Sequence, residues 1–254
     1  FGSQFDLYLP ISRHVNKLVR NFLDQSSRPA NLTATGDNVV TINPGIDDNF
    51  YDPSISKEDL QQLLINLNVG VKVSPTRPPV FLLTAGRLVK RKGHAWFIQH
   101  VLPTLPSHIH YLVAGTGPEN DRLPALIKRF APHRAHLLGR VSNDQLKILY
   151  NAVDAFIQPN LPFPGDPEGF GLVLLEAALC NRPVFAANLD GMSDAITHTQ
   201  NGYLLAAGSA SAWQAALSAP PYQAPTNARS FTLKRFGWPR QVSQYATALT
   251  NRFS

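Results

Sequence analysis

A cluster of basic side chains directly follows a strongly apolar stretch of the chain. The stretch Pro79–Ala85 (PVFLLTA) predicts a buried strand, and the segment Gly86–Gly93 (GRLVKRKG) carries four cations. Arg87 offers a planar fork that suits a phosphate, and Lys92 offers a point charge. Gly86 allows the backbone to turn tightly at the end of the strand. The pattern predicts an anion site, although a charge run taken alone is also typical of a solvated loop.

Two carboxylates eight positions apart frame a glycine-rich helix start in Glu168–Glu176 (EGFGLVLLE). Because glycine disfavours helix interiors, we expect the helix to begin near Phe170 or Gly171, which leaves Glu168 in the preceding loop. The free N–H groups of Gly171–Val173 then form an anion site at the positive end of the helix. Glu176 would lie within reach of ribose hydroxyls, and Glu168 within reach of hydroxyls beyond the phosphate. Each glutamate taken alone is more often an exposed helix residue.

A third glycine-rich segment, Gly115-Thr116-Gly117-Pro118, only partly matches the dinucleotide-binding fingerprint. Asn120 stands where that fingerprint has its third glycine, and Pro118 interrupts the pattern. This disfavours a nicotinamide-dependent dehydrogenase and favours a plain turn between a strand and a helix. The segment Asp190–Asp194 (DGMSD) offers a further helix start at the same edge, but alone it indicates no more than a capped helix.

Short apolar runs alternate with helical stretches along most of the chain, which is typical of βαβ units and a parallel sheet. We therefore expect an α/β fold with a Rossmann-like parallel sheet flanked by helices. In such sheets ligands bind at the carboxyl ends of the strands, where the glycine-rich segments lie. Expected strands are Phe5–Ile11, Val39–Ile42, Pro79–Ala85, Ile109–Ala114, Ala135–Leu138, Ala155–Gln158, Pro183–Ala187 and Tyr203–Leu205. Expected helices are Ser12–Leu23, Lys57–Leu67, His94–Leu102, Glu119–Phe130, Ser142–Ala152, Gly171–Leu179, Trp213–Leu217 and Arg240–Leu249.

The composition excludes several classes of protein. Apolar residues make up 44% of the 254 residues, enough for a substantial core, and no apolar run reaches the length of a membrane-spanning helix. The single cysteine, Cys180, excludes a disulfide framework and a cysteine-based zinc site, and the scattered histidines indicate no metal-ligand cluster. A net charge of +6 favours anionic partners such as nucleotide diphosphates or phospholipid head groups. Basic and aromatic residues do not interleave, so we expect no nucleic-acid partner.

Taken together and in this order, the motifs resemble the retaining glycosyltransferases of family 4, which have the two-domain GT-B architecture. The resemblance runs from Val39 to about Leu205 and matches the C-terminal, nucleotide-sugar-binding half of the family. Two glutamates at this spacing would be weak evidence on their own, but together with the basic loop upstream they are specific to the family. The matching pieces are INPGID (Ile42–Asp47), AGRLVKRKG (Ala85–Gly93), VAGTGPE (Val113–Glu119), LLGRVSNDQLKILYNAVDAFIQP (Leu137–Pro159), EGFGLVLLEA (Glu168–Ala177), RPVFA (Arg182–Ala186) and NGYLL (Asn201–Leu205).

The resemblance implies a role for each matching residue. Arg87 and Lys92 hold the diphosphate and stabilise it as a leaving group, and Glu168 orients the donor sugar. These three are the expected catalytic residues. Glu176 holds the ribose, the segment from Gly139 to Val141 lies by the base, and the turn before the helix binds the phosphates. The expected donor-binding residues are Gly86, Gly139, Val141, Phe170, Gly171, Leu172, Val173 and Glu176.

The implied reaction transfers a hexosyl group from a nucleotide-diphosphate sugar, such as a UDP- or GDP-sugar, with retention of the anomeric configuration. The acceptor would be a glycan or a lipid-linked molecule, as in polysaccharide biosynthesis. The family implies no cofactor and no metal. We expect a cytoplasmic protein, and the net charge is compatible with peripheral contact with an anionic membrane at its inner face.

The resemblance also implies a division of the chain. Residues 1–38 resemble the last strand, helix and linker of the family's N-terminal domain, 39–230 the Rossmann-like domain, and 231–254 the helix that crosses back. The chain starts at Phe1 and its only methionine is Met192, so we expect it to be trimmed from a longer protein. Half of the active site would then be missing. An alternative is therefore an isolated nucleotide-sugar-binding module without activity of its own.

Two positions depart from the family pattern. Asn181 replaces the usual glycine before the strand Pro183–Ala187, and asparagine tolerates the left-handed backbone that this turn needs. The usual Gly-Gly-x-x-Glu is Asp190–Asp194 here, so Asp194 keeps the negative charge on a shorter side chain.

Overall fold

The protein is built around a parallel sheet, as the alternation of strands and helices predicts. The computed structural model describes residues 7–25, 38–71 and 77–253. These residues form a six-stranded sheet in the order β3-β2-β1-β4-β5-β6, in which every neighbouring pair is parallel. The strands are β1 (Val80–Ala85), β2 (Ile109–Ala114), β3 (Ala135–Gly139), β4 (Ala155–Gln158), β5 (Val184–Ala187) and β6 (Tyr203–Leu205). The expected Rossmann-like fold class is confirmed.

The strand order reverses beside β1, which pairs with β2 on one side and with β4 on the other. At such a reversal the connections leave in opposite directions, so a crevice opens at the carboxyl ends of the two strands. The basic loop follows β1 and the loop to Glu168 follows β4. The topology therefore brings these two predicted site segments to one place.

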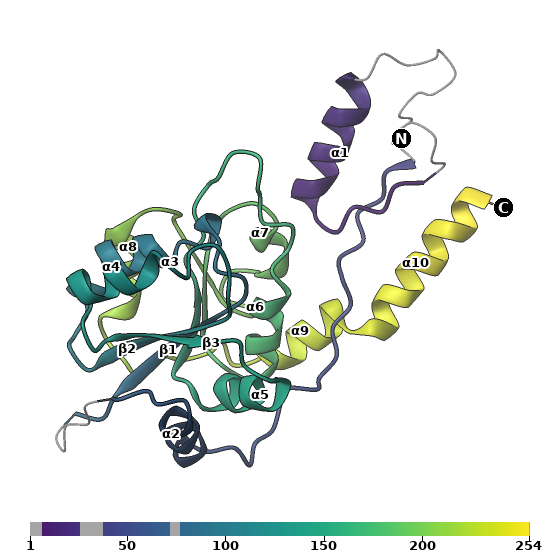
Figure 1. The fold of residues 1–254 in the computed structure, drawn as a ribbon. Coiled ribbons are helices and arrows are strands. Elements are labelled where there is room, and N and C mark those ends of the chain that lie inside the picture. The colour runs from purple at the N-terminus through teal and green to yellow at the C-terminus, as the bar shows by residue number, and fades with distance from the viewer. Residues whose placement is uncertain (1–6, 26–37, 72–76, 254) are drawn as a thin grey trace.

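Helices cover both faces of the sheet (Figure 1). One layer contains α2 (Lys57–Asn66), α5 (Asn143–Ala152), α6 (Leu172–Leu179) and α9 (Ala228–Phe236); the other contains α3 (His94–Trp96) with its continuations η4 (Phe97–Val101) and η5 (Leu102–Thr104), α4 (Leu123–Phe130) and α8 (Ala210–Leu217). The central strands β1, β2, β4 and β5 are almost entirely buried, as apolar strands covered on both faces must be, whereas the edge strands β3 and β6 are partly exposed. Among the described helices, none combines the length and the apolarity needed to cross a membrane.

Local sequence explains where several helices begin. Ser142 and Gln145 form a capping box at the start of α5, as expected, and Ser56 with Asp59 forms another at α2. Asn181 adopts the left-handed backbone, with a φ of 54°, that was expected for the turn after α6. These short-range signals act within a few residues, so they are readable from the sequence.

The N-terminal part and the last helix lie to one side of the sheet (Figure 1). Helix α1 (Arg13–Gln25) begins after Ser12, whose hydroxyl accepts a hydrogen bond from the Val15 N–H at 3.1 Å. Helix α10 (Trp238–Phe253) follows α9 and lines a hollow together with residues 40–42. The expected cap at Ser12 and the helix after it are present.

Two expected strands are wrong. Residues 39–42 do not join the sheet; Val39 forms an isolated parallel bridge with Tyr8, and the Ile42 N–H donates to the Pro10 carbonyl at 3.1 Å. The described part of the other expected strand, residues 7–11, contains only this bridge. Pro10 lacks an N–H donor, so it cannot extend a ladder. The two segments form a narrow pairing outside the sheet.

Three helices also differ from expectation. The helix expected from Glu119 begins only at Leu123, with Pro124 in its first turn, and the Glu119 N–H donates to the Leu88 carbonyl of the neighbouring loop at 3.0 Å. The helix expected over 94–102 is divided into α, π and 3-10 turns. The crossing helix expected over 231–254 is divided at Gly237 into α9 and α10, and α9 buries an inner face formed by Ala228, Thr232 and Phe236.

Candidate functional site

A hollow of about 290 Å³ lies where the β1 and β4 loops meet the start of α6. We call it the α6 hollow. It contains Lys92 of the basic loop, Glu168, and the backbone turn that leads into the helix. Its other wall comes from outside the sheet, from the N-terminal segment and the segment after residue 42. The lining residues are Ile11, Pro44, Lys92, Glu168, Gly169, Phe170, Gly171, Leu172 and Val173.

The carboxylate of Glu168 is the electrostatic centre of the α6 hollow. Its Oε2 accepts from the Lys92 ammonium at 2.6 Å and from the Asn160 amide at 2.9 Å, and it also pairs with the Arg91 guanidinium. Arg91 in addition bonds Asp166 through Nε at 3.0 Å. Among the described residues, none bonds the second oxygen of Glu168, so that oxygen is available to a ligand.

The charges around Glu168 explain its ionisation. Burial alone would raise the pKa of this carboxyl, but the charges of Lys92 and Arg91 and the hydrogen bonds outweigh it, and the pKa is lowered. Burial also lowers the pKa of Lys92, and the pairing with Glu168 only partly offsets this. The site thus holds an ionised carboxylate, which can only accept hydrogen bonds, inside a frame of cations.

The turn at the start of α6 has the form expected of an anion site. Gly171 caps the helix in the left-handed conformation, with a φ of 92°, which favours glycine. Within the described chain, the N–H groups of Gly171, Leu172 and Val173 have no hydrogen-bond partner. The Phe170 ring packs inward on Phe236, with ring centroids 5.7 Å apart, so Phe170 can contribute to the hollow only through its backbone. These unpaired donors and the positive helix end favour a negatively charged group.

A second hollow of about 370 Å³ lies between the ends of β1, β2 and β3. We call it the β1–β3 hollow. It is lined by Ala85, Gly86, Arg87, Ala114, Gly115, Thr116, Arg140, Val141 and Leu146. Arg87 is exposed there and its guanidinium bonds to no other described residue, so it is free to meet a ligand.

The two hollows adjoin at Lys92. A Cβ atom placed on Gly86, which lines the β1–β3 hollow, would lie 4.0 Å from the Lys92 Nζ. The ammonium therefore stands between the exposed Arg87 and the α6 turn. Arg87, Lys92 and the N–H groups of the α6 turn all lie along this edge, and Glu168 is the acidic side chain among the residues that line the two hollows. A ligand with an extended anionic part can therefore contact both hollows.

Two predicted binding residues lie behind the hollows rather than in their lining. Glu176 accepts a hydrogen bond from the Tyr150 hydroxyl on α5 at 2.6 Å, and burial raises the pKa of Glu176. Gly139 ends β3 in the left-handed conformation, and its carbonyl accepts the Gly115 N–H at 2.8 Å. The structure thus gathers Arg87, Gly86 and Val141 in one hollow and Lys92, Glu168 and the α6 turn in the other. Glu176 lies about one helical turn further along α6, after the turn that lines the α6 hollow.

The Gly115-Thr116-Gly117 turn has a packing role instead of a phosphate-binding one. A Cβ on Gly115 would lie 1.9 Å from the Gly86 carbonyl oxygen, and one on Gly117 would lie 2.5 Å from the Leu88 carbonyl oxygen. Glycine is therefore needed so that the β2 loop can lie against the β1 loop. Because α4 starts only at Leu123, no helix N-terminus faces this turn. This geometry disfavours the dinucleotide-binding interpretation.

Several side chains at the site were not predicted. Arg91 was expected only as part of the charge run, and the contributions of Asn160, Tyr150 and Ile11 were missed. Each acts through a contact made by distant parts of the chain; Arg91 and Glu168, for example, are 77 positions apart. Within the described ranges, no group of three or more His, Cys, Asp or Glu side chains is arranged to hold a metal ion.

The sheet order and the anion-accepting edge define a Rossmann-like α/β domain. Residues 79–219, more than half of the chain, match the family model "Glycosyl transferases group 1". The chain therefore belongs to this family.

Two curated relatives illustrate the family. An uncharacterised glycosyltransferase of Methanocaldococcus jannaschii is 31% identical over 168 residues, which cover 65% of this chain and 40% of the relative. The D-inositol 3-phosphate glycosyltransferase of Thermobispora bispora is 24% identical over 253 residues, 92% of this chain and 56% of the relative. The chain thus spans about half the length of these relatives.

Solved structures confirm the fold. HepE of Anabaena, in complex with UDP and glucose, superposes with a TM-score of 0.74 at 23% identity, covering 98% of this chain and 65% of HepE. Sucrose-phosphate synthase of Thermosynechococcus elongatus gives a TM-score of 0.73 at 21% identity, covering 99% of this chain and 59% of that protein. At these identities the likeness concerns the fold alone.

Proposed function

We propose that the chain is the C-terminal, donor-binding half of a family 4 retaining glycosyltransferase with GT-B architecture. The protein transfers a hexosyl group from a nucleotide-diphosphate sugar to a glycan or lipid-linked acceptor. The observation that carries this proposal is the ionised Glu168, framed by Lys92 and Arg91, beside the unpaired N–H groups of the α6 turn. Membership of the family supports the reaction class, and the UDP and glucose named for HepE support the kind of donor.

The proposed roles follow from the two adjoining hollows. Arg87, Lys92 and the α6 turn bind the diphosphate and stabilise the negative charge that develops on it as the leaving group. The free oxygen of Glu168 accepts hydrogen bonds from hydroxyls of the sugar. The β1–β3 hollow, with Val141, takes the nucleoside, and Glu176 holds the ribose. In this arrangement the protein's own cations neutralise the diphosphate, so we propose that no metal is required.

In this proposal the remaining part of the active site, and the acceptor, belong to an N-terminal domain like that of the family. The chain spans 40% and 56% of the two relatives, which leaves room for such a domain. Residues 1–38 would form the end of that domain, 39–230 the donor domain and 231–254 the crossing helix. The net charge of +6 supports contact with an anionic membrane surface, where lipid-linked acceptors lie.

Calorimetry with UDP and UDP-glucose tests donor binding by this chain. The Arg87→Ala change should weaken both ligands about 30-fold, the loss of a charge-assisted hydrogen bond of about 2 kcal/mol. Because Arg87 is exposed and unpaired among the described residues, the variant should fold normally. Lys90→Ala is the matched control, since Lys90 is an exposed cation of the same loop that lines neither hollow. Equal affinities for the wild type and Arg87→Ala would contradict the assignment.

Transfer itself is tested by an activity assay of the chain, alone and together with the N-terminal domain proposed above. We expect hexosyl transfer from a nucleotide sugar, with an α-linked donor giving an α-linked product by NMR. Binding of UDP-glucose without any transfer would instead favour the alternative, a nucleotide-sugar-binding module without activity. Inversion of the anomeric configuration would refute the retaining mechanism only.

A further inference from the structure

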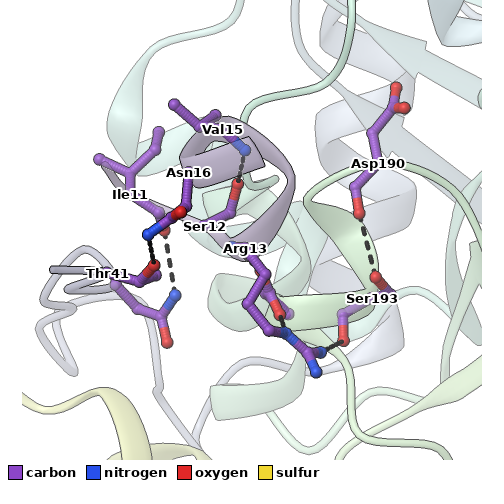
Figure 2. A network of polar contacts seen from close by, with 10 residues as sticks. Ile11, Ser12, Arg13, Val15, Asn16, Thr41, Asp190 and Ser193 are labelled. Carbon is purple, nitrogen blue, oxygen red and sulfur yellow. Dashed lines mark hydrogen bonds and ion pairs between the residues drawn. The ribbon is translucent and has the colours of Figure 1, made fainter. Parts of the chain in front are cut away.

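Helix α1 meets the sheet domain at one loop, Asp190–Asp194. The carboxylate of Asp194 accepts from both the backbone N–H and the Nε of Arg13, and the Arg13 Nη2 donates to the Ser193 carbonyl at 3.4 Å. The Asp194 side chain is 5% exposed and is therefore held firmly at the surface of the domain. Figure 2 shows the Arg13 side chain reaching from the start of α1 towards Ser193.

The start of α1 is in turn fixed to the segment after residue 38. Asn16 donates to the Thr41 hydroxyl at 2.9 Å, and Asn43 donates to the Ile11 carbonyl at 3.0 Å (Figure 2). The Ile11 Cδ1 lies 3.3 Å from the position that a Cβ on Gly169 would take. Hydrogen bonds and close packing therefore tie the beginning of α1 to the outer wall of the α6 hollow.

Asp190 connects this body to Glu168. Its Oδ1 lies 3.6 Å from the His14 Nδ1, while its Oδ2 accepts the backbone N–H of Glu168 at 3.0 Å. The next residue, Gly191, donates its N–H to the Glu168 carbonyl at 3.0 Å. Both sides of the Glu168 backbone are thus held by the loop that receives α1. These contacts form a continuous route from α1 to the Glu168 backbone, with the 3.6 Å approach of His14 to Asp190 as its link to the helix.

We propose that Asp190 is a positioning residue, which couples the start of α1 to Glu168 and thereby sets the affinity for the glycosyl part of a nucleotide sugar. The coupling consists of Arg13, His14, Asp190 and Asp194. It rests on the proposed function, because that function assigns the sugar to Glu168. Arg87 and Lys92 lie on the β1 loop, which these four residues do not touch. Losing the coupling should therefore affect the sugar more than the diphosphate.

The selective effect is measured as the ratio of the affinities for UDP-glucose and UDP. Asp190→Ala should weaken UDP-glucose about tenfold, the loss of one contact, and leave UDP within about twofold. Asp190→Asn should largely restore the ratio, because an amide oxygen still accepts the Glu168 N–H and asparagine tolerates the positive φ of 49° at this position. The double substitution Arg13→Gln/His14→Gln, which removes the contacts that α1 contributes, should also lower the affinity for UDP-glucose relative to that for UDP. Lys17→Gln, an exposed cation of the same helix, is the control and should change nothing.

Hydrogen exchange in the ligand-free chain gives a second readout. Asp190→Ala and Arg13→Gln/His14→Gln should both speed exchange of the Glu168 amide, and Lys17→Gln should not. Equal weakening of UDP and UDP-glucose, or unchanged exchange of Glu168 in a chain that binds UDP-glucose normally, would overturn the positioning role alone. A wild-type chain that binds neither ligand would overturn the proposed function and, with it, the sugar-binding part of this inference. In that case, faster exchange of the Glu168 amide in the variants would still support the structural coupling of α1 to Glu168.

Discussion

At the scale of single residues, Glu168 decides the electrostatics of the candidate site. Three donors converge on one of its oxygens, and two of them, Lys92 and Arg91, are cations. Removing a partner from a buried charge group costs more than the group contributes when intact, because the remaining charges lose their compensation. Glu168 is therefore expected to matter for stability as well as for ligand binding.

The substitution Glu168→Gln should lower the free energy of unfolding by about 3 kcal/mol near neutral pH, since it leaves the buried Lys92 unpaired. The folded-state pKa of Glu168 is lowered, so its contribution is present above the unfolded value of about 4.3 and is lost as the pH falls through the folded pKa. Urea unfolding at several pH values should show the two proteins converging in stability in acid. Asp166→Asn, which removes the half-exposed partner of Arg91, should cost less than about 1 kcal/mol. A constant difference between wild type and Glu168→Gln at all pH values would contradict this account.

At the scale of elements, the site depends on loops that lie against each other without side chains between them. A Cβ on Gly191 would lie 2.0 Å from the Gly169 carbonyl oxygen, although the φ of Gly191 is an ordinary −72°. The close approach, and not the backbone conformation, requires glycine there. The loop that leads into α7 (Met192–Ala195) thereby reaches the backbone of the Glu168 loop.

Gly191→Ala should lower the melting temperature and weaken UDP-glucose binding together, because the methyl group must push the Glu168 loop away from its place. Thermal unfolding and calorimetry on the same samples check both effects. Gly70→Ala is the control, since nothing lies within 4 Å of its Cβ position. A Gly191→Ala protein with wild-type melting temperature and affinity would show that the loops can separate without consequence.

The pairing of β2 with β3 carries a pH-sensitive contact far from the site. The His110 Nδ1 lies 3.2 Å from the His136 Nε2 and the rings are stacked. Burial lowers the pKa of both residues to about 4. A positive charge on His136 also disfavours protonation of His110, which lowers the pKa of His110 further. Both imidazoles are therefore neutral in the folded protein at neutral pH.

Stability should fall as the pH drops from about 6.5 towards 4, because the unfolded imidazoles bind protons in this window and the folded ones do not. His136→Gln should flatten that dependence while leaving UDP affinity at neutral pH unchanged. Unfolding curves measured at pH 7 and pH 5 check the first point, and calorimetry checks the second. An equally steep loss in the variant would assign the acid sensitivity to other groups.

At the scale of the whole molecule, the α6 hollow joins parts that lie at opposite ends of the chain. Ile11 and Pro44 face the turn of α6, and they belong to segments that pair outside the sheet. A ligand in this hollow is therefore expected to stabilise the placement of α1 against the sheet domain, and not only the loops of the sheet.

Saturating UDP-glucose should slow hydrogen exchange both at the α6 turn and at the start of α1, Ile11–Asn16. Helix α2 (Lys57–Asn66), which contributes no residue to either hollow, should exchange at its original rate apart from any global stabilisation. At about 100 times the dissociation constant, binding adds about 2.7 kcal/mol to the free energy of unfolding. Protection confined to the α6 turn would show that the outer wall does not take part in binding.

The sequence by itself determined the features that depend on neighbouring residues. The six strands of the sheet, the caps at Ser12 and Ser142, and the glycine-led turn before α6 are set by apolar alternation, hydroxyl caps and backbone preferences within a few positions. The placement of Lys92, Glu168 and the α6 turn in one hollow followed from these, because parallel strands bring their carboxyl ends to one edge. The division of the other site residues between two hollows did not follow from them.

Only the tertiary structure decided which distant groups meet. The Tyr150 partner of Glu176, the Asn160 and Arg91 partners of Glu168, and the seating of α1 on Asp194 all depend on how layers and loops pack. Arg13 and Asp194 are 181 positions apart, and no local pattern relates them. Hydrogen bonds and ion pairs act over a few ångströms, so the sequence can position a charge on its own element, whereas the fold of the whole chain selects its partner.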